Sequence, residues 1–396
     1  LRHPPRGRAP LGSGPALGPR MSGRLLSLDA FRGFTIAAML LVNNPGDWAH
    51  VYKPLLHAEW HGWTATDWVF PFFVFISGIS MTLSLSRRAA LGDDRLPLML
   101  TTMKRGFVIV FIGLLLNFIP AFDLTTLRIP GVLQRLGLLT IACAPLAVYL
   151  GWRGQALVGL AALALYTALM LWVPVTGPDG VTRVGSLQPG EDTGAALDRW
   201  LLEGHLWARS RTWDPEGLLS TLPALGSSVA GLLVGHWLAT PRSSLEKTAW
   251  LFLAGLLSLL AGELLNATSL PINKALWTPA YVFAMTGWAC LVFGATHFLL
   301  DTQPSAQARE ACTRWAQPLR AYGMNALFLF VASSLLAKLL GSVTLGGQSL
   351  KALLYAPLAA LPIAPVNASL LFAIGFVLVF WGIAHLMFKR QWFIKV

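Results

Sequence analysis

Apolar runs of about the length that crosses a bilayer recur along the whole chain. A membrane-spanning helix needs roughly 20 mostly apolar residues. Ten stretches have this pattern, at 28–44, 67–86, 105–120, 131–150, 155–174, 217–238, 248–265, 277–299, 320–340 and 367–388. A further apolar stretch, 350–363, is interrupted by Pro357 and Pro362, so we predict that it is interfacial or re-entrant; as a full span it would be the eleventh and would move the C-terminus to the other side. The pattern predicts an all-α, polytopic membrane helical bundle.

The longest segments outside these runs are the N-terminus and the stretch between the fifth and sixth spans. Residues 1–23 are rich in Pro, Gly and Arg and have no apolar periodicity, so we expect a disordered N-terminal extension. Met21 is a candidate for the native start, and no apolar segment typical of a cleavable signal peptide precedes the first span. The remainder, 24–396, is expected to form one membrane domain with a long loop at 175–216.

Composition supports the membrane assignment and orients the chain. Of its 396 residues, 55% are hydrophobic and only 12% charged, with a mean hydropathy of +0.59, which excludes a soluble globular protein of this length. The net charge of +12 does not indicate a nucleic-acid partner, because Lys and Arg also accumulate in the cytoplasmic loops of membrane proteins. An inside N-terminus places 20 of the 30 basic residues on the cytoplasmic side. We therefore predict cytoplasmic N- and C-termini, an extracytoplasmic loop 175–216 and a multi-pass protein of the cytoplasmic (inner) membrane.

The stretch from His57 to Gly78 carries the strongest chemical signal, because a polar segment with two histidines leads directly into a membrane helix. Thr64 and Asp67 have the spacing of a capping box, which would satisfy free backbone N–H groups at the start of that helix. Imidazole titrates near neutral pH and serves as acid, base or nucleophile. The alternative is that the histidines, with the neighbouring tryptophans, only anchor the helix at the interface.

Polar residues at membrane depth are costly unless they face a cavity and one another. On the predicted topology, four separate loops bring such residues to the outer face, and we expect them to line one water-accessible cavity. The candidates are Asn43, Asn44, His57, His61, Asp67, Arg128, Gln134, Arg135, Asp214, Glu216, Glu263, Asn273 and Lys274. Alternatives remain for individual members: Arg128 and Lys274 would also be explained by snorkelling to the interface, and Asp214 and Glu216 as first-turn carboxylates of the sixth span.

The inner face is basic. Arg32 lies near the start of the first span, and Lys104 and Arg105 near the start of the third. These cations would suit anionic lipid headgroups or the phosphates of a cytoplasmic donor. The chain has neither GxGxxG nor a Walker A motif, so a nucleotide would have to be held by cations and helix ends.

A set of motifs, in order along the chain, resembles the heparan-α-glucosaminide N-acetyltransferase family, and most closely its bacterial members within the transmembrane acyltransferase superfamily. The motifs are Leu28-Asp-Ala-Phe-Arg-Gly33, Val42-Asn43, His57-Ala-Glu-Trp60, Asp67 with Val69-Phe-Pro-Phe-Phe-Val-Phe75, Arg128-Ile-Pro-Gly-Val-Leu-Gln-Arg135, Asp214-Pro-Glu-Gly-Leu-Leu-Ser-Thr-Leu-Pro223 and Pro271-Ile-Asn-Lys-Ala-Leu-Trp277. The resemblance extends from about residue 24 to the C-terminus.

This resemblance implies that acetyl-CoA in the cytoplasm donates an acetyl group to the amine of a glucosamine on the far side. The family's catalytic histidine, in an HASW-type motif, corresponds to His57, with His61 as a spare, and its VN asparagine corresponds to Asn43. The spacing from Asn43 to His57 is longer than in the lysosomal enzyme, so Asn44 is a second candidate. The lumenal domain and extra first span of that enzyme are not found, and an amino sugar of cell-wall material is the expected acceptor.

The resulting hypothesis assigns a role to each group. Arg32 and Arg105 would hold the CoA phosphates, and His57 would act as nucleophile or general base. Asn43 would stabilise the oxyanion and Asp67 would orient the imidazole. No metal is expected, because His57 and His61 lie ahead of the predicted helix and lack the glutamates of a zinc motif.

Two alternatives stay open, a polytopic transporter or permease for a sugar or anion and an O-acyltransferase of a cell-wall glycan. A transporter is favoured by composition but opposed by the lack of a detectable internal repeat. The small-residue face Gly226-Ser-Ser-Val-Ala-Gly231 with Gly235 would permit a homodimer or packing within one chain.

Overall fold

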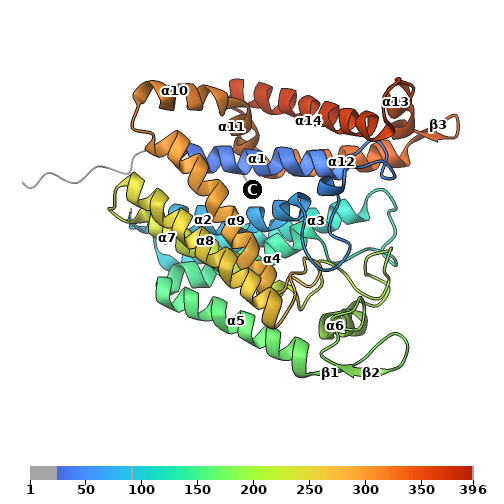
Figure 1. The fold of residues 1–396 in the computed structure, drawn as a ribbon, viewed down its shortest axis with the longest axis horizontal. Helices are drawn as coiled ribbons and strands as arrows, with labels where there is room; N and C mark the ends of the chain where they lie inside the picture. Colours follow the sequence, from blue (N-terminus) through green and yellow to red (C-terminus); the bar gives the residue numbers. More distant parts are fainter. Residues whose placement is uncertain (1–24, 91, 395–396) are drawn as a thin grey trace, which may run out of the picture.

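The structure, a computed structural model, describes residues 25–90 and 92–394, and the segment 1–23 predicted to be disordered lies outside these residues. The regular secondary structure of the described chain is almost entirely helical (Figure 1), so the predicted all-α class is confirmed. Its long helices are α1 (Leu26–Asn43), α2 (Val69–Ala90), α3 (Arg95–Phe118), α4 (Val132–Tyr149), α5 (Trp152–Trp172), α7 (Thr221–Ala239), α8 (Ser244–Thr268), α9 (Pro279–His297) and α14 (Pro365–Lys389). Its shorter helices are α6 (Thr193–Leu202), α10 (Ala306–Trp315), α11 (Gln317–Met324), α12 (Ala326–Ser342) and α13 (Leu350–Ala359).

Short strands and tight helical turns connect the helices. The strands form two antiparallel hairpins, β1 (Pro174–Thr176) with β2 (Thr182–Val184) and β3 (Thr344–Leu345) with β4 (Gln348–Ser349). The tight helical turns are η1 (Lys53–Leu55), η2 (Ala65–Trp68) and the π-helical η3 (Phe298–Thr302). Figure 1 shows α6, both hairpins and α13 at the right-hand end of the long helices, while α10 lies at the opposite end.

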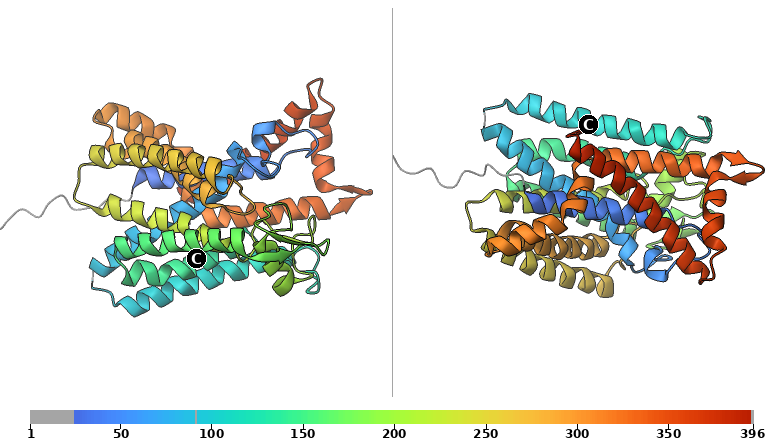
Figure 2. Two further views of the ribbon diagram at one scale, coloured as in Figure 1. Left: turned by 60° about the horizontal axis from the view of Figure 1, so that its bottom comes forward. Right: turned by 90° about the horizontal axis from the view of Figure 1, so that it is seen from above.

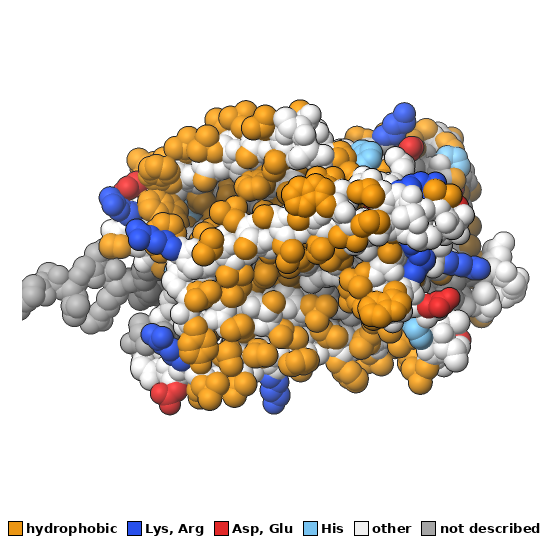
Figure 3. Space-filling view, turned by 90° about the horizontal axis from the view of Figure 1, so that it is seen from below, with side chains coloured by type: hydrophobic (Ala, Val, Ile, Leu, Met, Phe, Trp, Pro, Cys, Tyr) orange, Lys and Arg blue, Asp and Glu red, His pale blue; other side chains and the backbone are white. Residues whose placement is uncertain are grey.

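Nine unbroken helical segments of the described chain are long and apolar enough to span a membrane, and each overlaps a predicted span. The largest difference is at α3, which begins at Arg95, so Lys104 and Arg105 lie within the helix and not at its start. Figure 3 shows hydrophobic side chains over the middle of one face, with most charged side chains toward the two ends. This distribution is typical of a helical polytopic membrane protein. Which end faces the cytoplasm stays a prediction.

The ninth predicted span, 320–340, corresponds to two helices with a break between them. α11 and α12 meet at an angle of 82°, with Asn325 in a non-helical conformation between them. The buried Asn325 amide donates to the carbonyl oxygen of Trp392 (2.9 Å) and accepts from the N–H of Ile394 (2.9 Å). Hydropathy misses this break because the partners of the amide come from the distant C-terminal segment. The stretch 350–363 contains α13, whose 10 residues are too few to cross a bilayer, as predicted.

Close approach between helices depends on small residues. A Cβ atom added at Gly33 of α1 would overlap the carbonyl oxygen of Leu319 in α11, and one added at Gly231 of α7 would overlap the carbonyl oxygen of Phe75 in α2. A Cβ atom added at Gly226 of α7 would come within 3.0 Å of the Leu163 side chain in α5. The small-residue face of α7 is therefore used within one chain, which is one of the two explanations that the sequence allows.

Helix α1 is central to the bundle. It contacts α2, α9, α11, α12 and α14, and its residues Phe31, Ile36 and Leu40 are almost fully buried. Figure 2 shows α1, in blue, among the orange and red C-terminal helices. The first N–H groups of α1 donate to the carboxylate of Asp301, at 3.2 Å from Leu26 and 3.1 Å from Ser27. A carboxylate at this position stabilises the start of a helix. Helix α1 is therefore held at its N-terminus by Asp301 and along its length by the neighbouring helices.

Candidate functional site

The site begins where the chain enters α2. Thr64 and Asp67 form the predicted capping box around the 3₁₀ turn. The Asp67 carboxylate is fully buried, and its Oδ2 accepts hydrogen bonds from the backbone N–H groups of Thr64 (2.9 Å) and Ala58 (3.1 Å). Its Oδ1 lies 2.7 Å from Nδ1 of His57. The carboxylate therefore both caps the helix and contacts the imidazole, the two roles that the sequence suggested for it.

Asp67 holds the ring of His57 through Nδ1, and the His57 side chain is 52% exposed. A carboxylate has no proton to donate, so Nδ1 carries the hydrogen and donates it to Asp67. The other nitrogen, Nε2, then keeps its lone pair and is the basic, nucleophilic atom. Asp67 thus fixes both the tautomer and the orientation of the imidazole.

Lys274 lies against this pair. Its Nζ is 2.9 Å from Nδ1 and 3.2 Å from Nε2 of His57, and 3.4 Å from Oδ1 of Asp67. Because Nζ is nearly equidistant from the two ring nitrogens, it lies over the face of the imidazole and not in line with either lone pair. Burial lowers the pKa of the Lys274 ammonium, although the Asp67 carboxylate acts in the opposite direction.

The loop before α9 presents Lys274 through a compact hydrogen-bond network. Asn273 is fully buried, and its Oδ1 accepts from the N–H of Leu276 (2.9 Å). Its own N–H donates to Oγ1 of Thr278 (3.2 Å), and that hydroxyl donates to the carbonyl oxygen of Pro271 (2.7 Å). Asn273, a predicted substrate-binding residue, therefore stabilises the loop that carries Lys274.

A second polar cluster joins the loop before α4 to the loop before α7. Arg128 donates two hydrogen bonds to the buried carboxylate of Asp214 (2.8 and 2.6 Å) and one to Glu216 (2.6 Å). Burial disfavours the Arg128 cation, but the bond to Asp214 and the two negative charges raise its pKa above the ordinary value. Asn117 holds the same loop by donating to the carbonyl oxygens of Arg128 (2.8 Å) and Pro130 (3.1 Å).

This cluster removes two simpler explanations. Arg128 does not snorkel as a free cation, since its guanidinium is paired in the fork geometry that suits a carboxylate. Asp214 and Glu216 do not belong to the first turn of α7, which starts at Thr221. Glu216 also lines the cavity described next, whereas Asp214 is fully buried behind it.

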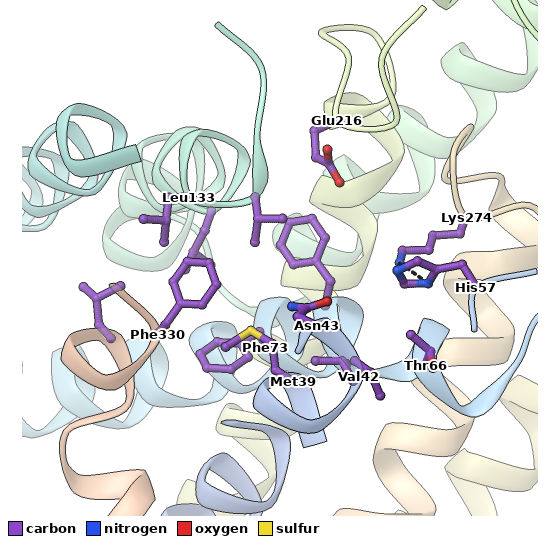
Figure 4. Close-up of a pocket in the computed structure, with 15 residues that line it drawn as sticks. Met39, Val42, Asn43, His57, Thr66, Phe73, Leu133, Glu216, Lys274 and Phe330 are labelled. Carbon is purple, nitrogen blue, oxygen red and sulfur yellow. Dashed lines mark hydrogen bonds between the residues drawn. The ribbon is translucent and has the colours of Figure 1, made fainter. Parts of the chain in front are cut away.

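A cavity with about 720 Å³ of empty space, its mouth included, lies beside His57 (Figure 4). Its polar wall consists of Asn43, His57, Thr66, Glu216 and Lys274. Its apolar wall consists of Met39, Val42, Val69, Phe70, Phe73, Val132, Leu133, Leu136, Leu327 and Phe330. Figure 4 shows His57 and Lys274 on one side and Leu133 and Phe330 on the opposite side. The cavity is therefore polar on one part of its wall and apolar on the rest, whereas the sequence predicted a polar space.

Several predicted site residues lie elsewhere. Asn44 is buried and donates to the carbonyl oxygen of Leu40 (2.8 Å), so it terminates α1. His61 is exposed, with Nδ1 3.4 Å from the amide of Asn273, and Glu263 is exposed on α8. Within the described part of the chain, the wall of the cavity does not include Asn44, His61, Asn273 or Glu263.

Two further predicted residues lie on α4. Arg135 is buried, donates to the carbonyl oxygen of Gly217 (3.0 Å) and to Oγ of Ser220, and lies over the ring of Trp277 at 5.2 Å. Gln134 is also buried and packs against the backbone of α3. Both residues connect α4 to its neighbours behind the cavity wall.

The two arginines predicted to hold donor phosphates lie on different helices. Arg32 on α1 is partly buried and donates to Asp29 (3.2 Å), to Oγ of Ser80 (2.7 Å) and to the carbonyl oxygen of Gly323 (3.4 Å). Arg105 is exposed on α3. Arg32 is thus next to the break between α11 and α12, a position that the sequence did not reveal.

The apolar wall is the part of the site that sequence reasoning missed. Leu327 and Phe330 follow directly after the helix break and reach the cavity from the C-terminal part of the chain. Their composition is the same as that of a lipid-facing helix, so no hydrophobic pattern marks them. The sequence does mark the helix break itself. Gly323 and Asn325, two residues with low helix propensity, lie close together inside an apolar run.

Comparison with known proteins confirms the family resemblance that the motifs indicated. Residues 24–197 match the model of the heparan-α-glucosaminide N-acetyltransferase family, catalytic region. The chain is 29% identical over 366 residues to the heparan-α-glucosaminide N-acetyltransferase of Mus musculus, covering 80% of this chain and 54% of the mouse protein. It is also 29% identical over 359 residues to that of Homo sapiens, covering 78% and 52%. The chain thus spans about half the length of the curated relatives it matches.

Proposed function

We propose that this chain, a relative of the heparan-α-glucosaminide N-acetyltransferases, is a membrane acyltransferase that moves an acetyl group from cytoplasmic acetyl-CoA to the amine of a glucosamine-type sugar on the extracytoplasmic side. The observation that carries the proposal is the His57–Asp67 pair, whose free Nε2 adjoins a cavity large enough for small substrates. A histidine oriented by a buried carboxylate is a recurring device of acyl transfer.

In the proposed reaction, Nε2 of His57 either attacks the thioester carbonyl or takes a proton from the sugar ammonium. Asp67 holds Nδ1–H and stabilises the positive charge that develops on the ring. Asn43 donates a hydrogen bond to the tetrahedral oxyanion, an interaction worth about 3 kcal/mol where such donors have been removed. CoA thiolate then leaves, and the amine nitrogen becomes an amide.

The acceptor binds, in this proposal, against the polar wall of the cavity, between Glu216 and His57. Glu216 lines the cavity while one of its carboxylate oxygens is held by Arg128. A fixed carboxylate attracts the ammonium group of an amino sugar and orients it toward His57. The O-acylation alternative lacks this support, because a hydroxyl acceptor carries no charge for Glu216 to bind.

The proposed sidedness follows from the distribution of basic residues. With both termini in the cytoplasm, the cavity and loop 175–216 lie on the outer side, and Arg32 lies toward the donor side. We place the protein in the cytoplasmic (inner) membrane on this basis.

The test measures release of free CoA thiol by detergent-purified protein given acetyl-CoA, with and without glucosamine. We expect amine-dependent release by the wild type, none by His57→Ala, and near-normal release by His61→Ala, because His61 lies outside the cavity wall. N-acetylglucosamine, which has hydroxyls but no amine, tests O-acylation. Intact acetyl-CoA with glucosamine and with a panel of wall amino sugars would contradict the proposal and favour transport.

A further inference from the structure

We propose that Lys274 is an internal acetyl acceptor: when no amino sugar occupies the cavity, the acetyl group activated at His57 passes to Nζ of Lys274 and forms an amide. This inference rests on the proposed acyltransferase function. It adds a covalent modification site to the cavity wall, and it assigns Lys274 a chemistry besides binding.

The geometry around His57 supports this transfer. An acetyl group on Nε2 is conjugated with the imidazole, so its carbonyl lies in the plane of the ring. A nucleophile must approach such a carbonyl from above or below that plane. Nζ of Lys274 already lies over the ring face, 3.2 Å from Nε2, the atom to which the acetyl carbon would be bonded. The acetyl carbon would lie one bond outward from Nε2, so a small shift of the lysine side chain brings Nζ to the roughly 3–3.5 Å that characterises a near-attack arrangement.

Lys274 is also held in this position by its surroundings. The buried Asn273 and Thr278 fix the loop that carries it, so little conformational freedom must be lost before attack. Its side chain is 20% exposed, and burial lowers the pKa of its ammonium, which increases the fraction present as the nucleophilic amine. The Asp67 carboxylate, 3.4 Å from Nζ, stabilises the positive charge that develops on this nitrogen during attack.

The step balances without any further reactant. The Nζ lone pair adds to the acetyl carbon, the bond between that carbon and Nε2 breaks, and its electron pair returns to the imidazole. The attacking nitrogen loses one proton, which the freed Nε2 of the half-exposed His57 takes up and releases to water. Together with the first step, acetyl-CoA and a lysine amine give CoA thiolate, one proton and N-acetyl-lysine.

The consequence for the enzyme is self-limitation. The amide removes a positive charge beside Asp67 and places a methyl group over the ring of His57. An amino sugar bound between Glu216 and His57 would take the acetyl group first and so protect Lys274. The modification would therefore accumulate when donor is present and acceptor is absent.

The experiment incubates the full chain in detergent with acetyl-CoA carrying a ¹³C-labelled acetyl group, and maps labelled lysines by peptide mass spectrometry. Without glucosamine we expect label at Lys274 at least about tenfold above that at the exposed Lys53, which can react only with acetyl-CoA from solution. Glucosamine should suppress this label, and His57→Ala should abolish it. Lys274→Arg, which keeps the charge, should show no labelled residue at this position.

Each outcome decides between the two proposals. Label at Lys274 equal to that at Lys53, or undiminished in His57→Ala, overturns this inference while glucosamine-dependent CoA release leaves the proposed function intact. If neither label at Lys274 nor CoA release with any amino sugar is seen, the proposed function fails and this inference with it.

Discussion

Replacing Asp67 by Asn tests the central pair with the smallest change in shape. The amide keeps the volume of the carboxylate and can still accept the N–H of Thr64 with its oxygen. Its NH₂ group would then face Nδ1 of His57, donate to it and move the ring proton to Nε2. The nucleophilic nitrogen would be lost although every residue of the cavity wall remained.

The size of the effect follows from how His57 is exposed. In a serine protease triad the corresponding change lowers kcat about 10⁴-fold because the wrong tautomer is favoured. His57 is 52% exposed, so water can replace part of what Asp67 supplies. We therefore expect a loss of about 10²- to 10³-fold in kcat, or roughly 3–4 kcal/mol. KM for glucosamine should change little, because Asp67 is fully buried and lies behind the cavity wall.

The assay is the initial rate of CoA release at saturating acetyl-CoA, with thermal unfolding of the same samples. Thr64→Ala is the matched control, since it weakens the capping box but leaves the carboxylate against His57. Thr64→Ala should lower Tm and keep most of kcat. Asp67→Asn should instead lower kcat and keep most of the wild-type Tm. A folded Asp67→Asn variant with wild-type kcat would refute the role given to this carboxylate.

Two other substitutions test the outer loops. Arg128→Ala should lower the free energy of unfolding by about 3 kcal/mol, because it leaves Asp214 buried and without its cation. Thermal unfolding measures this loss, and an unchanged Tm would contradict the pairing of Arg128 with Asp214. Burial raises the pKa of Asp198 to about 7, so the folded protein retains a proton that the unfolded chain loses near its ordinary value of 3.8. Stability should therefore fall by up to about 4 kcal/mol as the pH rises from about 4 to about 7. Asp198→Asn should remove this fall and raise Tm at pH 8, and a pH profile identical to that of the wild type would contradict the assignment.

The parts of this structure that follow local rules could be predicted from the sequence. Bilayer thickness sets the length of a spanning helix, so nine of the spans are visible as apolar runs. The capping box at Thr64 and Asp67 depends on a spacing of three residues and is equally visible. His57 lies ten residues before Asp67, and its place in a polar segment directly before a membrane helix is also visible in the sequence.

The pairings between loops could not be predicted in the same way. Arg128 and Asp214 are 86 residues apart, and His57 and Lys274 are 217 apart. Topology placed these residues on one face, but it did not distinguish a paired arginine from one that snorkels. That distinction depends on burial and on fork geometry, which only the fold supplies.

In the proposed orientation, the position of the cavity along α1 sets the distance that a cytoplasmic donor must reach. Asn43 lines the cavity, and Arg32 precedes it by 11 residues on the same helix. At a rise of 1.5 Å per residue, about 16 Å separate them, roughly half of the 30 Å hydrocarbon core. Met39 extends the apolar wall inward and leaves only about 10 Å to Arg32. Arg32 donates to Gly323 beside the α11–α12 break, and Leu327 and Phe330 continue from that break to the cavity. In the proposed function, the thioester would follow this line of residues from the break beside Arg32 toward His57.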